Sequence, residues 1–242
     1  MKQMIVSILA LIGAIALVGC AYLLWCNRPG RTVVSVNGRI LTDRELTWRA
    51  QTLIDDAKRV EKLLIPENRM SEAMHHYRRT AAKMWIVKEV LLAAAVESGV
   101  KAAAEDEKQT LAKMERQLKS RHLTPEQFFK EGPIPEATKR SDFKEAVLIG
   151  KYTKREIEDK LSVGTKEIDD RMKELRELRA QIVKSGKKPE FRADRKTAIE
   201  MLRQEKYNNA FRDLFREKFG KMAVECPEFP DLESVDGVSP PR

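Results

Sequence analysis

The residues best suited to acid–base or metal chemistry stand next to one another in short runs. His75 and His76 are adjacent, and on a regular helix adjacent side chains point about 100° apart, so they cannot both face one metal ion. The carboxylates at 105–107 and 169–170 lie among lysines and arginines, as they do on salt-bridged helix surfaces. We therefore expect an exposed histidine pair and solvated carboxylates at these positions.

Sequence motifs for catalysis are also missing. The 242 residues contain no glycine-rich phosphate loop, no CxxC or HExxH motif and no serine-nucleophile elbow. The counts of 11 Gly, 10 Pro and 3 Cys exclude a collagen, a low-complexity chain and a disulfide-dense mini-protein. We predict a protein that works by binding and not as an enzyme, with no catalytic residue, no metal and no cofactor.

The chain is basic, with 46 Lys or Arg against 37 Asp or Glu and a formal net charge of +9. The two signs are interspersed along the sequence, which is typical of solvated helical surfaces. Basic residues gather at 187–188 and at 192–196, but no nucleic-acid-binding motif surrounds them. We therefore expect no nucleic-acid partner.

The first 30 residues have the pattern of a membrane signal or anchor. Residues 4–26 form a run of 23 residues without a charge, and Arg28, Pro29 and Arg31 follow it. As a helix this run would be about 34 Å long, enough to cross a hydrocarbon core of about 30 Å. The sequence predicts a membrane contact through residues 1–30.

Three fates of this segment remain open: an uncleaved anchor, a cleaved signal peptide and a lipid anchor. The third rests on residues 17–20 (Leu-Val-Gly-Cys), which resemble the lipobox of bacterial lipoproteins and make Cys20 a lipidation candidate. Lys2 before the run and the arginines after it leave the charge comparison undecided. Each alternative places the remaining chain in a bacterial-type cell envelope, on the periplasmic side. Whether Cys26 and Cys226 pair is open too.

A β-hairpin is expected directly after this segment. Residues 32–36 are rich in β-branched side chains, Asn37-Gly38 suits a type I′ turn, and residues 39–41 return. Thr42 and Glu45 then form a capping box that opens a helix reaching to Leu64.

Helical spacing of apolar residues continues along the chain, which predicts a mainly α protein. We expect the hairpin to be followed by a helical domain that a long C-terminal helix and a short strand close. Residues 227–242 hold four prolines and are predicted to be a disordered tail. The expected helices cover 71–98, 104–121, a short segment from 124, 139–161, 166–184 and 194–219, and the strand covers 222–226.

The order of several segments resembles the SurA-like periplasmic chaperone family, which includes the membrane-anchored PpiD and the lipoprotein PrsA. The first match is the hairpin and helix start at 33–46 (VVSVNGRILTDREL). Further matches follow in the family's order at 84–92 (MWIVKEVLL) with 97–100 (ESGV), at 123–128 (LTPEQF) and at 163–168 (VGTKEI). The resemblance implies a chaperone domain of the SurA N-terminal type over residues 31–226.

The chain departs from that family where full-length relatives insert a parvulin prolyl isomerase domain. Only 16 residues separate Leu178 from Arg195, whereas an isomerase domain needs about 100. We therefore expect residues 183–194 to be a linker and predict no isomerase activity.

The resemblance implies weak binding of non-native chains, for which adaptable Met and aromatic side chains are suited. Each candidate lies at a helical spacing that would also suit a core residue, except Trp48, which is off the main apolar stripe. Two functions stay open: a membrane-tethered chaperone for non-native secreted or outer-membrane polypeptides, and an anchored helical scaffold for one folded partner. The client-binding candidates are Trp48, Met84, Trp85, Phe128, Phe129 and Phe143.

Overall fold

The computed structural model describes residues 30–60, 62, 64–119 and 123–238, and within them the fold is mainly α-helical, as the sequence predicts. The predicted segment 1–30, with Cys20 and Cys26, lies outside the described residues except for Gly30. The described elements, in chain order, are β1 (Thr32–Val36), β2 (Arg39–Thr42), α2 (Asp43–Val60), α3 (Met70–Glu97), α4 (Ala104–Lys119), α5 (Pro125–Lys130), α6 (Glu136–Glu156), α7 (Thr165–Lys184), α8 (Arg195–Phe219), β3 (Val224–Glu225) and α9 (Val235–Val238).

The hairpin forms where the sequence places it, and the C-terminal strand joins it. The antiparallel sheet has the order β2-β1-β3. Asn37 and Gly38 both adopt positive φ, 48° and 81°, as a type I′ turn requires. The Asn37 backbone N–H also donates to the Ala223 carbonyl at 2.9 Å, so the turn itself is tied to the far end of the chain.

Capping explains why helix α2 begins where it does. The Glu45 backbone N–H donates to Thr42 Oγ1 at 3.3 Å, and the Thr42 backbone N–H donates to Glu45 Oε2 at 3.2 Å. This is the predicted capping box. The helix ends at Val60, four residues before the Leu64 that the apolar spacing suggested.

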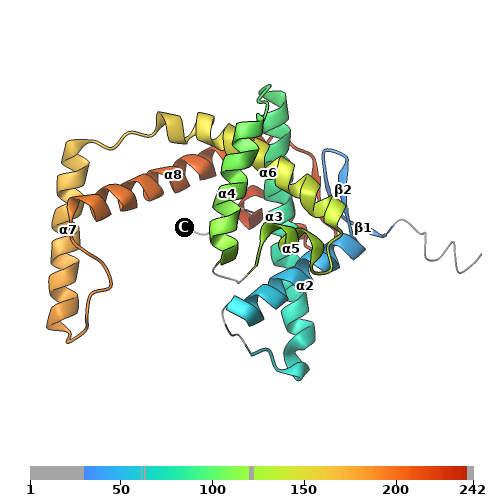
Figure 1. Ribbon diagram of the computed structural model, residues 1–242, viewed down its shortest axis with the longest axis horizontal. Coiled ribbons are helices and arrows are strands. Elements are labelled where there is room, and N and C mark those ends of the chain that lie inside the picture. The colour runs from blue at the N-terminus through green and yellow to red at the C-terminus, as the bar shows by residue number, and fades with distance from the viewer. Residues whose placement is uncertain (1–29, 61, 63, 120–122, 239–242) are drawn as a thin grey trace, which may run out of the picture.

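The main core lies between the sheet, the long helix α3, the C-terminal half of α8 and the C-terminal segment (Figure 1). Leu46, Ile86 and Phe215 are fully buried there. A second cluster joins the end of α3 to α6 through Leu91, Ala95 and Tyr152. These two clusters make up what we call the body.

The C-terminal segment corrects the sequence prediction, because residues 227–238 are ordered. A 3-10 turn (Pro230–Glu233) and α9 place Phe229, Leu232 and Val238 in the main core. Arg78 of α3 holds the segment from outside through Glu228, with Nη2–Oε2 at 2.7 Å. The proline content suggested disorder, but apolar residues at three-residue spacing bury enough surface to order the segment. Gly237 permits the close packing, because a Cβ there would lie 1.9 Å from the Asp231 carbonyl oxygen.

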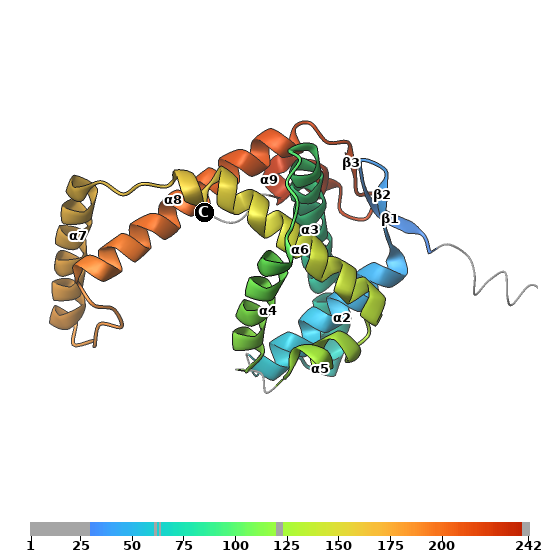
Figure 2. The same cartoon turned by 45° about the horizontal axis from the view of Figure 1, so that its top comes forward.

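Helix α7 and the first half of α8 project away from the body, at the end of the molecule opposite the β-hairpin (Figures 1 and 2). We call residues 163–206 the arm. The arm has its own small core of Ile168, Leu175, Ala198 and Leu202. The predicted linker belongs to this arm, since Phe191 and Ala193 of the connecting loop pack against that core.

Candidate functional site

Three of the predicted client-binding aromatics meet at the junction of α5 and α6. The ring centroids of Phe128 and Phe129 lie 5.6 Å apart, and those of Phe129 and Phe143 lie 5.8 Å apart. Phe129 is buried, whereas the other two rings are half-buried. Lys139 donates to the Phe128 carbonyl at 2.7 Å, closing α5 onto α6. The burial of Phe129 excludes it from a surface that contacts a partner in this conformation.

The other three candidates are not gathered into one surface. Trp85 is buried in the main core, which is the structural alternative that its helical spacing left open. Trp48 on α2 is half-buried, with the Arg44 guanidinium 4.7 Å from its ring centroid. Met84 on α3 is the well exposed member, with 57% of its surface accessible. Trp85 therefore joins Phe129 as a core residue.

Cys226 has no disulfide partner among the described residues, and its side chain is fully buried between the sheet and the C-terminal segment. Burial raises the pKa of this thiol to about 11, so it stays protonated and unreactive at neutral pH.

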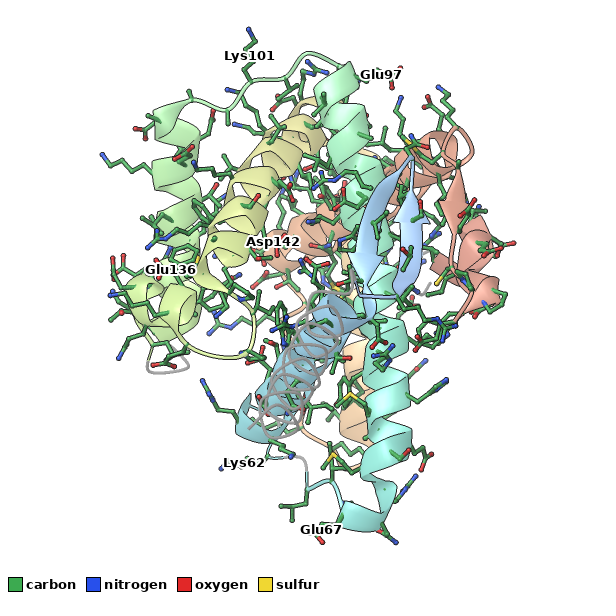
Figure 3. The ribbon with its side chains drawn as sticks, turned by 90° about the vertical axis from the view of Figure 1, so that its right-hand side faces the viewer. Lys62, Glu67, Glu97, Lys101, Glu136 and Asp142 are labelled. Carbon is green, nitrogen blue, oxygen red and sulfur yellow. The ribbon has the colours of Figure 1, made fainter. Side chains whose placement is uncertain are left out.

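A network of six charged side chains links four elements of the body. We call it the charge network: Arg39 (β2), Arg49 (α2), Lys88 and Glu89 (α3), and Asp142 and Glu145 (α6). Lys88 Nζ lies 2.8 Å from Asp142 Oδ1 and 2.7 Å from Glu145 Oε2. Arg49 Nη1 lies 2.9 Å from Asp142 Oδ2, and Arg39 Nη2 lies 2.9 Å from Glu145 Oε1. In Figure 3 Asp142 lies toward the middle of the body, whereas Glu136 at the start of the same helix lies at its edge.

The most buried member of the network is Glu89, which is 2% exposed. Its carboxylate lies 2.9 Å from Arg39 Nε and 3.1 Å from Lys88 Nζ, but neither oxygen receives a well-aligned hydrogen bond. Three cations face three carboxylates, so the charges balance within the network. This arrangement holds the hairpin, α2, α3 and α6 together through ion pairs.

The pKa values of the network are consistent with fixed ion pairs. Burial by itself would raise the pKa of Asp142, but hydrogen bonds and charges from Arg49 and Lys88 outweigh it and lower the pKa. Burial likewise opposes the effect of Lys88 and Arg39 on Glu145, whose pKa is also lowered. Both carboxylates are therefore ionised at neutral pH.

Within the described residues, no three His, Cys, Asp or Glu side chains come together as a metal site would require. His75 and His76 are exposed side by side on α3, as expected from their adjacency. None of the helices in the described part of the chain is long and apolar enough to cross a membrane.

The arm owes its hairpin shape to local signals at each helix end. The Gly164 N–H donates to Glu167 Oε2 at 2.7 Å, and the Thr197 N–H donates to the Asp194 N-cap at 2.8 Å. Gly186, with φ of 76°, ends α7 in a Schellman-type turn, with the Lys187 N–H bonded to the Ile182 carbonyl.

Ion pairs then fasten α7 to α8. Lys206 Nζ lies 2.8 Å from the Glu167 carboxylate, and Arg171 pairs with Glu205. The hydrogen bond from Lys206, helped by the Gly164 N–H, lowers the pKa of Glu167. The arm is therefore a helical hairpin that ion pairs and a small core hold together, and the predicted linker forms its connecting loop.

One shallow hollow opens on the arm and another at its junction with the body. The root hollow, of about 350 Å³, lies where α8 leaves the body and has an apolar side chain, Met201, among polar ones. The tip hollow, of about 530 Å³, lies at the C-terminal end of α7. The root hollow is lined by Arg171, Met201, Gln204, Glu205, Asn208, Asn209 and Arg212, and the tip hollow by Arg176, Arg179, Ala180, Val183, Lys184 and Ala193.

Large apolar side chains are exposed beside these hollows. Val183 of the tip hollow is 57% exposed, and Met201 of the root hollow is 43% exposed. Carboxamides of Gln204, Asn208 and Asn209 accompany Met201. The arm thus combines exposed apolar carbon with groups that can donate and accept hydrogen bonds.

The chain matches no family model, no curated protein and no solved structure. The arrangement of its own side chains therefore carries the functional argument.

Sequence reasoning did not identify the arm as a binding surface. A signal was available, because residues 176, 179, 180, 183 and 184 recur at intervals of three and four and so share one face of a helix. In the sequence alone this face is indistinguishable from an ordinary solvated helix surface. The structure shows that Ala193 of the 185–194 loop lies beside it and helps to form the tip hollow.

Proposed function

We propose that this protein is a membrane-tethered extracytoplasmic chaperone that holds non-native secreted or outer-membrane polypeptides without isomerising prolines. The observation that carries the proposal is the arm, which projects from the body, with one hollow on it and another at its junction with the body, beside exposed apolar side chains. Such a surface is accessible and separate from the main core.

The chemistry of the root hollow suits a ligand that has no fixed sequence. A non-native chain exposes peptide groups and apolar side chains together. Carboxamides can both donate to and accept from peptide groups. Gln204 Nε2 donates to Asn208 Oδ1 at 2.8 Å, which leaves the Gln204 carbonyl oxygen to accept and the Asn208 amide group to donate. Met201 is unbranched and polarisable, so it adapts to different apolar side chains.

The sequence supports the tether and the compartment. The uncharged run at 4–26 is long enough to span a bilayer, and Cys20 offers a lipid anchor as the alternative. Several sequence segments resemble SurA-like chaperones and follow one another in the order of that family, which supports the same class of activity. The short loop at 185–194 leaves no room for an isomerase domain.

One feature favours a second candidate, a scaffold for a single folded partner. Ion pairs from Lys206 to Glu167 and from Arg171 to Glu205 stiffen the arm. A stiff, preorganised helical face is suited to one complementary surface. The two functions differ in whether the partner is unfolded.

The proposal is tested by light scattering from an unfolded client that aggregates on dilution. Residues 31–242 hold every buried core residue that the structure describes, so this part serves as the test protein. We expect it to suppress aggregation, and Met201→Asp to weaken the suppression. Leu64→Asp makes the same change at a side chain that is 92% exposed on the body and should behave like wild type. No suppression at several-fold excess over client would overturn the proposal.

A further inference from the structure

Cationic side chains flank the tip hollow, and small apolar side chains lie between them. Arg176, Arg179 and Lys184 stand around Ala180 and Val183 on one face of α7, and all five side chains are exposed. The residues that line this hollow include no carboxylate and no aromatic ring. A ligand that fills it therefore meets positive charge on its rim and aliphatic carbon beneath.

The rim cations have no partner, in contrast to the cations of the arm that join α7 to α8. Lys206 and Arg195 pair with Glu167 and Asp169 of α7, and Arg171 pairs with Glu174 and Glu205. Within the described residues, Arg176, Arg179 and Lys184 enter no hydrogen bond and no ion pair. Their guanidinium and ammonium donors are free for a ligand.

Helix stability accounts for only one of these three charges. Cations in the last turn of a helix are favoured by the helix dipole, and this explains Lys184. Arg176 lies two turns earlier, where the dipole no longer favours a cation. The excess is also regional, since residues 173–196 hold nine lysines and arginines against four carboxylates. This segment carries +5 of the net charge of +9.

We propose that the tip hollow binds acidic amphipathic polypeptide segments. Carboxylates of the segment pair with Arg176, Arg179 and Lys184, and an aliphatic side chain packs on Val183 and Ala180. Arginine suits this role because its guanidinium can bind a carboxylate through two parallel hydrogen bonds. The inference rests on the proposed function and adds a charge preference among clients.

The position of the hollow and the residues that line it favour a polypeptide over other anions. The arm lies at the end of the molecule opposite β1 (Figure 1). The proposed tether precedes β1 in the sequence, so it enters the described part of the chain at the end opposite the hollow. Single-stranded nucleic acid is held by stacking its bases on aromatic rings, which the lining of the hollow lacks.

The test is a fluorescence anisotropy titration with the full chain in nanodiscs of neutral phosphatidylcholine. The probe is a short synthetic peptide of alternating Glu and Leu, compared with the same peptide carrying Gln for each Glu. We expect the acidic peptide to bind about tenfold more tightly at low salt, from three exposed ion pairs of modest strength. The preference should shrink as salt is added.

A pair of charge-reversal variants separates the hollow from general basicity. Arg176→Glu/Arg179→Glu should abolish the preference for the acidic peptide. Lys166→Glu/Lys173→Glu makes the same change of charge at exposed positions of α7 outside the hollow and should retain the preference. Circular dichroism on all variants establishes that the helices remain intact.

Three outcomes would overturn the inference. The first is equal affinity for both peptides while an unfolded client still binds, in which case the proposed chaperone function stands alone. The second is the absence of binding by either peptide or any unfolded client, which would remove both proposals. The third is displacement of the acidic peptide by phosphatidylglycerol vesicles or single-stranded DNA at lower concentration than by unlabelled peptide.

Discussion

Lys88 joins more charges in the body than any other side chain of the charge network, since Glu89, Asp142 and Glu145 all lie within 3.1 Å of its ammonium. The sequence marks Lys88 only as one of many lysines on a helix. Its role depends on α6 crossing α3, a contact that residue spacing alone does not specify. At this scale the sequence predicted helix caps well and long-range charge pairing not at all.

Replacing Lys88 tests how much the charge network contributes to stability. Lys88→Met removes one cation and leaves three carboxylates against two arginines in a partly buried site. We expect the free energy of unfolding to fall by about 3 kcal/mol, measured by urea denaturation. Lys144→Met on α6 alters an exposed lysine that has no ion pair among the described residues and should change stability by less than about 0.5 kcal/mol. Equal effects of the two variants would contradict this role.

The lowered pKa values of Asp142 and Glu145 predict that the free energy of unfolding decreases at acidic pH. A carboxylate whose pKa is lower when folded stabilises the fold above its unfolded pKa, and this contribution is lost as the pH falls. Unfolded values are about 3.9 for Asp and 4.3 for Glu. The free energy of unfolding should therefore be steady above about pH 5 and decrease below it. Denaturation across this range should show a shallower decrease in Asp142→Asn/Glu145→Gln than in wild type.

At the scale of elements, local signals predicted most of the fold. The Asn37-Gly38 turn and the Thr42 capping box form where the sequence places them, and α5 and α8 begin one residue after the expected starts at 124 and 194. The C-terminal segment was missed because its ordering depends on contacts with the hairpin and α3, far away in sequence. The prediction of disorder was based on the proline content of the segment, which does not indicate that its apolar residues are buried.

Leu232 tests whether the C-terminal segment is part of the core. The side chain is fully buried, so Leu232→Ala should lower the free energy of unfolding by about 3 kcal/mol through lost burial and a cavity. Leu64→Ala removes the same atoms from an exposed position and should leave stability within about 0.5 kcal/mol of wild type. Chemical denaturation of the two variants decides the matter. A neutral Leu232→Ala would mean that the segment is disordered after all.

The separate core of the arm predicts that the arm opens independently of the body. Leu175→Ala should increase amide hydrogen exchange in α7 and the first half of α8, because it truncates a buried leucine of a small cluster. Exchange in α3 should not change. Leu178→Ala, three residues along the same helix, alters an exposed leucine and is the matched control. Increased exchange throughout the body would show that arm and body open together.

At the scale of the whole molecule, the candidate site depends on how the arm stands away from the body. The sequence supplied the two helices and the segment between them, and it drew attention to aromatic residues elsewhere. Phe129 and Trp85 turned out to be core residues. The hollows depend on how α7, α8 and the 185–194 loop pack in space. The periodicity of the sequence predicts the helices but not this packing.

The central claim is that the arm distinguishes non-native chains from folded ones. It is tested most directly by the affinity of residues 31–242 for one small disulfide-bonded protein, native or else reduced and carbamidomethylated so that it stays unfolded. Anisotropy titrations should show that the unfolded form binds at least about tenfold more tightly than the native form. Met201→Asp should reduce that difference and Leu64→Asp should not. Equal affinity for the two forms, or tighter binding of the native form, would contradict the account.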